Sequence, residues 1–103
     1  MMPVRWTRNA ANDLTRIVER IQANGRASKR SARKASKIIA KRVVRKMYTA
    51  IGELSKFPER GRIGLVSNTR ELALLPWPYI AVYEILQEQV HVLRIRHTSQ
   101  DWP

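Results

Sequence analysis

The sequence of 103 residues contains no cysteine. Disulfide bonds, thiolate zinc sites and cysteine nucleophiles are therefore excluded, and the composition suits a reducing compartment. Long apolar runs are also missing, since no stretch approaches the roughly 20 residues that a membrane span needs. The first 13 residues hold no long apolar segment, so we expect no signal peptide, no membrane partner and a cytoplasmic location.

Acidic residues are scarce and unevenly placed. Eight Asp and Glu stand against 20 Lys and Arg, which gives a formal net charge of +12. The whole excess lies in residues 1–50, and no acid occurs between Glu19 and Glu53, a stretch that holds 11 basic residues. So large a charge indicates a polyanionic partner, such as a nucleic acid or an acidic protein.

The hydrophobic fraction of 44% is ordinary for a globular protein, and the length suits one domain over residues 1–103. Residues 4–6 alternate as in a short strand, and Thr7 can then cap a helix whose apolar residues recur three and four apart. A second amphipathic stretch is predicted over about residues 27–56, as one long helix or two shorter ones end to end, with Ile39 on its apolar face. We therefore expect Ile39→Asp to unfold the protein, because it buries an unpaired charge between helix and sheet.

Basic residues recur on another face of this second helix with the same spacing. Like charges three and four apart repel each other by a few tenths of a kcal/mol for each pair, unless an anionic partner relieves them. We expect Lys37→Asp to leave the protein folded and to weaken binding to an acidic partner. The predicted basic face consists of Arg30, Lys34, Lys37, Lys41 and Arg45.

Three strand-like runs follow, at Arg70–Leu75, Tyr79–Leu86 and Val90–Ile95, and the last two are rich in β-branched and aromatic residues. Residues 87–89 connect the last two as a tight hairpin. The order of strand, two helices and three strands predicts an α+β fold. In it an N-terminal strand is followed by a helical hairpin and an antiparallel β-meander, with the helices packed on one face of the sheet.

Six short motifs occur in a fixed order along the chain. They are Trp6–Leu14 (WTRNAANDL), Pro58–Arg62 (PERGR), Arg70–Leu72 (REL), Pro76–Tyr83 (PWPYIAVY), Val90–His97 (VHVLRIRH) and Gln100–Pro103 (QDWP). Together they resemble the ParE/RelE toxins of bacterial type II toxin–antitoxin modules. The match covers nearly the whole chain and is weakest over the basic residues 26–46.

The resemblance implies a small cytosolic toxin with two helices and a sheet, and no cofactor. A cognate antitoxin neutralises such a toxin by wrapping it with an extended or helical segment, acidic or amphipathic in character. The expected assembly is a toxin–antitoxin hetero-oligomer. Within the family, RelE-like members cleave mRNA on the ribosome, whereas ParE-like members inhibit DNA gyrase.

Departures from the RelE-like pattern bear on the choice between these targets. RelE-like nucleases carry basic residues at positions that align here with Glu71, Ala73, Ile80 and near Gln100, none of which is basic. The family's functional tyrosine near the C-terminus has no counterpart in this chain. These departures favour a gyrase inhibitor that acts by binding. A ribosome-dependent endoribonuclease and a non-toxic basic nucleic-acid-binding domain stay open as alternatives, and so does the question of whether the protein is an enzyme.

Candidate site residues gather toward the C-terminus. RNA cleavage by 2′-hydroxyl attack needs proton transfer and cations on the phosphate. In a nuclease these groups would come from Arg94, Arg96, His97 and Tyr83. His91 and His97 lie six residues apart, about 20 Å along a strand, so we expect no metal site. The candidates for binding the target or the antitoxin are Arg70, Arg94, Arg96, His97, Gln100 and Trp102.

Overall fold

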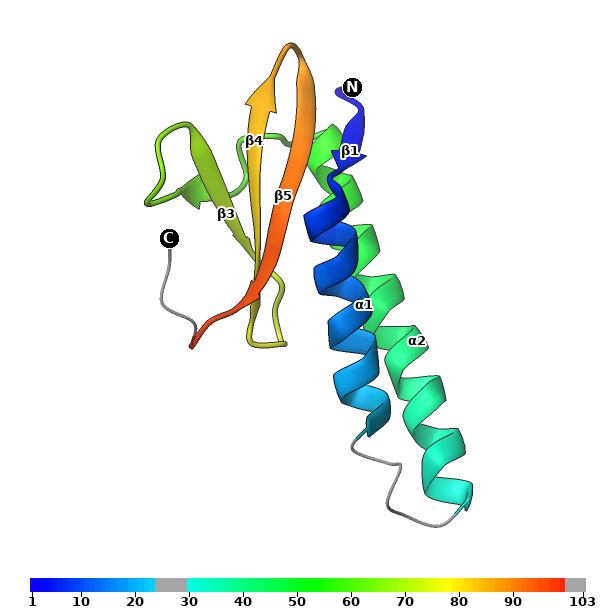
Figure 1. Cartoon of the computed structure of the whole chain (residues 1–103). Helices are drawn as coiled ribbons and strands as arrows, with labels where there is room; N and C mark the ends of the chain where they lie inside the picture. Colours follow the sequence, from blue (N-terminus) through cyan, green and yellow to red (C-terminus); the bar gives the residue numbers. More distant parts are fainter. Residues whose placement is uncertain (24–29, 100–103) are drawn as a thin grey trace.

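The computed structural model describes residues 1–23 and 30–99, without the side chains of residues 30–33. The elements are β1 (Val4–Trp6), α1 (Arg8–Ala23), α2 (Arg30–Gly52), the 3₁₀ turn η1 (Glu53–Ser55), β2 (Arg62–Ile63), β3 (Thr69–Ala73), β4 (Tyr79–Leu86) and β5 (Gln89–His97). In Figure 1 the two helices run side by side as an antiparallel hairpin, and the end of the hairpin extends beyond the sheet. The predicted second helical stretch corresponds to α2 continued by η1, and its first predicted residues, 27–29, lie outside the described residues.

The five strands form one mixed sheet in the order β1-β5-β4-β3-β2. β1 runs parallel to β5, with Val4 opposite Val90, and the other neighbours are antiparallel. The predicted α+β fold is confirmed, including the N-terminal strand, the helical hairpin packed against the sheet and the antiparallel meander of β3, β4 and β5. The parallel pairing of β1 places the last strand, β5, inside the sheet.

Thr7 joins helix α1 to strand β5. Its Oγ1 accepts a hydrogen bond from the backbone N–H of Ala10 at 3.2 Å, which caps the first turn of α1. The same hydroxyl lies 2.9 Å from the carbonyl oxygen of Val92 and 3.0 Å from that of Leu93, and it donates to them. The cap predicted from the sequence is confirmed, and it fixes the point at which α1 leaves the sheet.

The turn between β4 and β5 consists of Gln87 and Glu88, with φ of 52° and 60°. Two residues with positive φ form the type of turn whose twist matches that of the flanking strands. The predicted hairpin is therefore confirmed.

The core lies between the sheet and both helices, and the largest fully buried helical side chains come from the C-terminal half of α2 and from η1. Met47 and Ile51 of α2 and Leu54 of η1 are fully buried against the sheet. Val90 and Val92 of β5 are also fully buried, and they belong to the same cluster. Strand β5 therefore both contacts α1 and supplies buried side chains to the core.

The prediction that Ile39 is buried is wrong. Ile39 and Ile38 are each 52% exposed, whereas Ala40 is 1% exposed. This part of α2 belongs to the stretch of the hairpin that extends beyond the sheet, where α1 is its neighbour (Figure 1). A helix with a single neighbour buries a narrower stripe than one that also lies under a sheet. Here that stripe runs through Ala40, Val43 and Met47, so a charge at position 39 lies in water.

Candidate functional site

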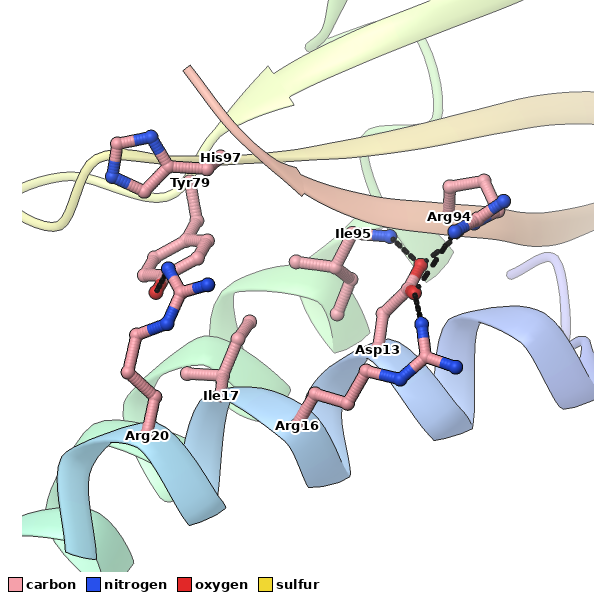
Figure 2. A pocket seen from close by; sticks show the side chains of 8 residues that line it. All are labelled: Asp13, Arg16, Ile17, Arg20, Tyr79, Arg94, Ile95 and His97. Carbon is pink, nitrogen blue, oxygen red and sulfur yellow. Dashed lines mark hydrogen bonds and ion pairs between the residues drawn. The ribbon is translucent and has the colours of Figure 1, made fainter. Parts of the chain in front are cut away.

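A carboxylate on α1 fastens the outer edge of β5. Strand β1 ends at Trp6, so beyond Val92 this edge has no strand partner among the described residues. Asp13 takes that place, because its Oδ2 accepts the backbone N–H of Ile95 at 2.9 Å. The Arg94 guanidinium holds the same carboxylate with two hydrogen bonds, from Nε at 2.8 Å and from Nη2 at 3.1 Å (Figure 2).

This ion pair is partly buried. The Asp13 side chain is 7% exposed and that of Arg94 is 40% exposed. The hydrogen bonds that Arg94 donates to Asp13 raise the pKa of the guanidinium above its ordinary value. The two-point geometry also fixes the plane of the guanidinium. Arg94 is therefore held in one orientation between α1 and β5.

A second buried carboxylate lies on β3. Glu71 has a side chain only 4% exposed, and its Oε1 accepts hydrogen bonds from Arg62 at 3.1 Å (Nε) and 2.8 Å (Nη2). Its Oε2 accepts a longer hydrogen bond from Nη2 of Arg96 at 3.5 Å. The Arg96 side chain is itself only 10% exposed. Arg94 and Arg96 are thus paired with different carboxylates, one on α1 and the other on β3.

Tyr83 of β4 is fully buried, and its hydroxyl holds the loop that precedes β2. The hydroxyl donates to the carbonyl oxygen of Pro58 at 2.7 Å and accepts from the backbone N–H of Gly61 at 2.9 Å. Burial raises the pKa of the Tyr83 phenol above its ordinary value. Nη1 of Arg70 donates to the carbonyl oxygen of Gly61 at 2.9 Å. Both side chains therefore hold the loop in place.

A small pocket opens between α1 and the C-terminal end of β5 (Figure 2). Its volume is about 100 Å³. The lining residues are Asp13, Arg16, Ile17, Arg20, Tyr79, Arg94, Ile95 and His97. The His97 ring meets the Tyr79 ring edge-on, with centroids 5.3 Å apart, and its Nδ1 lies 2.7 Å from the Ser99 hydroxyl.

Comparison with known proteins agrees with the fold and the motifs. The model of the ParE toxin of the type II toxin–antitoxin system parDE matches residues 26–102. Toxin RelE2 of Caulobacter vibrioides is 34% identical over 100 residues, which are 97% of this chain and 99% of that protein. The chain belongs to the ParE toxin family.

Two further relatives are consistent with this assignment. The protein Y4kP of Sinorhizobium fredii is 35% identical over 100 residues, which are 97% of this chain and 92% of that protein. A chain of the chromosomal ParDE toxin–antitoxin system from P. aeruginosa superposes with a TM-score of 0.77 at 25% identity, over 94% of this chain and 96% of that one. The resemblance to the ParE/RelE toxins is confirmed. The protein is the toxin component of a type II toxin–antitoxin module, and such a module implies a cognate antitoxin.

The toxin's predicted site residues do not converge on one place. Arg94 and His97 line the same pocket, whereas Arg96 is paired on β3 and Tyr83 is buried under the loop before β2. Arg70 is half-buried beside that loop. Gln100 and Trp102 lie outside the described residues.

The predicted basic face of the toxin lies along α2. Lys34, Lys37, Lys41 and Arg45 are all exposed, and Arg30 is the first residue of the helix. Within residues 1–23 and 30–99, no group of three His, Asp or Glu is placed to hold a metal ion. No helix in the same residues is long and apolar enough to cross a membrane.

Sequence reasoning missed Asp13 and its arginine neighbours on α1. The signal was present, because Asp13 falls between Ala10 and Ile17 in the buried row of α1, where a carboxylate needs a partner. Arg16 and Arg20 follow at helical spacing, but the approach of Arg20 to Tyr79 depends on how α1 packs against the sheet. That packing was not predictable from periodicity.

Proposed function

We propose that this toxin inhibits DNA gyrase by binding to it, as ParE-like members of its family do. It acts in the cytoplasm, and its cognate antitoxin neutralises it in a hetero-oligomer. The observation that supports this proposal is the scatter of the groups that a ribonuclease needs. Cleavage by 2′-hydroxyl attack requires a proton acceptor, a proton donor and cations around one phosphate. Here Arg96 is paired with Glu71, and Tyr83 is fully buried.

The position of Glu71 adds to this argument. It aligns with a basic residue of RelE-like nucleases, yet here it is a buried carboxylate that is paired with both Arg62 and Arg96. A guanidinium already paired with a buried carboxylate offers less stabilisation to the additional charge that develops on a phosphate. This face of the sheet is therefore built for stability rather than for phosphate chemistry.

The exposed cations of α2 supply the contact with DNA that gyrase holds. Contacts of this kind neutralise phosphates without reading sequence, and they weaken steeply as salt rises. The pair Lys37→Gln and Lys41→Gln removes two charges from the basic face, so we expect weaker inhibition and a shallower salt dependence. Lys56→Gln, an exposed lysine beyond α2, is the matched control and should leave both unchanged.

The test uses purified toxin, gyrase and plasmid. We expect inhibited supercoiling and accumulation of cleaved gyrase–DNA complexes, and we expect no effect from Met47→Asp, which buries a charge in the core. In cells, toxin expressed alone should arrest growth with a DNA-damage response while mRNA stays intact. Growth arrest with cleaved mRNA and undamaged DNA would contradict the proposal and favour a ribosome-dependent endoribonuclease.

A further inference from the structure

The pocket between α1 and β5 gathers positive charge from two elements that are far apart in the sequence. Arg16 and Arg20 reach it from α1, and Arg94 reaches it from β5 (Figure 2). Among the residues that the structure describes, Asp13 is the only acidic side chain in its lining. The described part of the lining therefore carries two formal positive charges in excess.

The single carboxylate is already committed to other groups. Both oxygens of Asp13 accept hydrogen bonds from Arg94, and Oδ2 also accepts the backbone N–H of Ile95. Arg16 approaches Asp13 only at 3.9 Å, with its side chain 74% exposed. An ion pair this loose and this exposed contributes little, so the Arg16 guanidinium is available to another anion.

Polar donors of different geometry face the same space. Nη1 of Arg20 lies 3.5 Å from the Tyr79 hydroxyl, and the edge-on contact with His97 holds the Tyr79 ring in place. Arg94 uses Nε and Nη2 for Asp13 and has no partner for Nη1 in the described part of the chain. Three guanidinium groups and a phenol thus surround one hollow.

We propose that this pocket binds a phosphate group, either as inorganic phosphate or as one phosphate of a nucleic-acid backbone. Its volume of about 100 Å³ is several times the roughly 10–15 Å³ that one ordered water needs. One guanidinium can satisfy both oxygens of a carboxylate, as Arg94 does for Asp13. A tetrahedral anion accepts donors from several directions. Arg16 and Arg20 offer whole guanidinium groups from α1, and Arg94, already paired with Asp13, adds only its Nη1 from β5.

The proposal does not depend on gyrase being the target, because it concerns the isolated toxin. The experiment is a titration of ¹⁵N-labelled toxin with sodium phosphate at constant ionic strength, followed by NMR. The reporters are the Nε–Hε signals of the pocket arginines and the amide of Ile95, which is hydrogen-bonded to Asp13. We expect saturable shifts confined to these signals, with a dissociation constant on the order of millimolar.

Variants distinguish phosphate binding in this pocket from non-specific attraction of phosphate to a positively charged protein. Arg20→Gln should weaken phosphate binding by about tenfold, because it removes a charge-assisted donor. Tyr79→Phe removes only the hydroxyl and should weaken binding by a smaller factor. Arg8→Gln is the matched control, since Arg8 is an exposed arginine on the same helix outside the pocket. Equal losses in Arg20→Gln and Arg8→Gln would overturn the proposal.

Two further titrations identify the source of the phosphate. A short DNA duplex that shifts the same signals, with the same sensitivity to Arg20→Gln, assigns the pocket to a nucleic-acid backbone. Shifts with inorganic phosphate alone assign it to a small phosphate. A hexaglutamate peptide that displaces phosphate and binds more tightly overturns the proposal in favour of an acidic protein, and so does the absence of any saturable shift.

Discussion

Replacing Asp13 tests whether the toxin depends on the junction between α1 and β5. Removing one member of a fully buried ion pair costs about 3–5 kcal/mol. Here Arg94 is 40% exposed, so water hydrates much of its charge once Asp13 is gone, and the cost is smaller. Asp13→Ala removes hydrogen bonds between charged groups and leaves the N–H of Ile95 unpaired. We therefore expect it to lower the free energy of unfolding by about 2–3 kcal/mol. In a protein of 103 residues this lowers the melting temperature by roughly 10 °C.

The assay is urea unfolding at neutral pH, with circular dichroism as the signal. Asp13→Asn keeps an oxygen for the N–H of Ile95 but loses the charge, so we expect about half the loss of Asp13→Ala. Glu19→Ala removes an exposed carboxylate from the same helix and should change stability by less than about 0.5 kcal/mol. The reasoning fails if Asp13→Ala and Glu19→Ala are equally stable.

A double-mutant cycle isolates the ion pair itself. Arg94→Ala and Asp13→Ala each remove the same two hydrogen bonds, so the double variant should be more stable than the sum of the single losses implies. We expect a coupling free energy of about 1–2 kcal/mol. Strict additivity would show that the two side chains contribute independently.

Three further predictions follow from buried and exposed positions. Because the pKa of Tyr83 is raised in the folded protein, the neutral phenol stabilises the fold fully below about pH 10, and this stabilisation is lost as the pH rises above that value. In alkaline denaturation, Tyr83→Phe should lack the part of the pH dependence that comes from this phenol. Ile39→Asp should change the free energy of unfolding by less than about 0.5 kcal/mol, whereas Met47→Ala should lower it by about 2–5 kcal/mol in urea denaturation. Gly61→Ala should lower the melting temperature in calorimetry, because its Cβ would lie 2.7 Å from the Tyr83 hydroxyl and 2.9 Å from a backbone oxygen, and a wild-type melting temperature would refute that contact.

Local features of the fold were predictable, because each depends on neighbours in the sequence. The cap at Thr7 and the turn at Gln87 and Glu88 were read from local sequence pattern. The position of Ile39 was not predictable in the same way. Both Ile39 and Ala40 fit an apolar row at helical spacing, and only the partners of α2 decide which of them is covered.

The ion pairs at the candidate site were not predicted, because most of them join segments that are far apart in the sequence. Asp13 and Arg94 are 81 residues apart, so no spacing rule links them. The pairing of Glu71 with Arg62 depends on the register of β2 on β3, where the two residues lie opposite each other. Motif resemblance identified the family correctly. Two of the arginines predicted as site candidates, Arg94 and Arg96, are also the partners of buried carboxylates.

The place of β5 in the sheet affects when the toxin can fold during its own synthesis. β5 is the last strand to be made, yet it lies between β1 and β4 and carries the residues to which Thr7 and Asp13 bind. A nascent chain that ends before residue 89 therefore leaves β1 without a strand partner and α1 without its anchor on the sheet. Folding waits for contacts between the two ends of the chain, which are slow to form. The complete five-stranded sheet thus forms late, after His97 has left the ribosome.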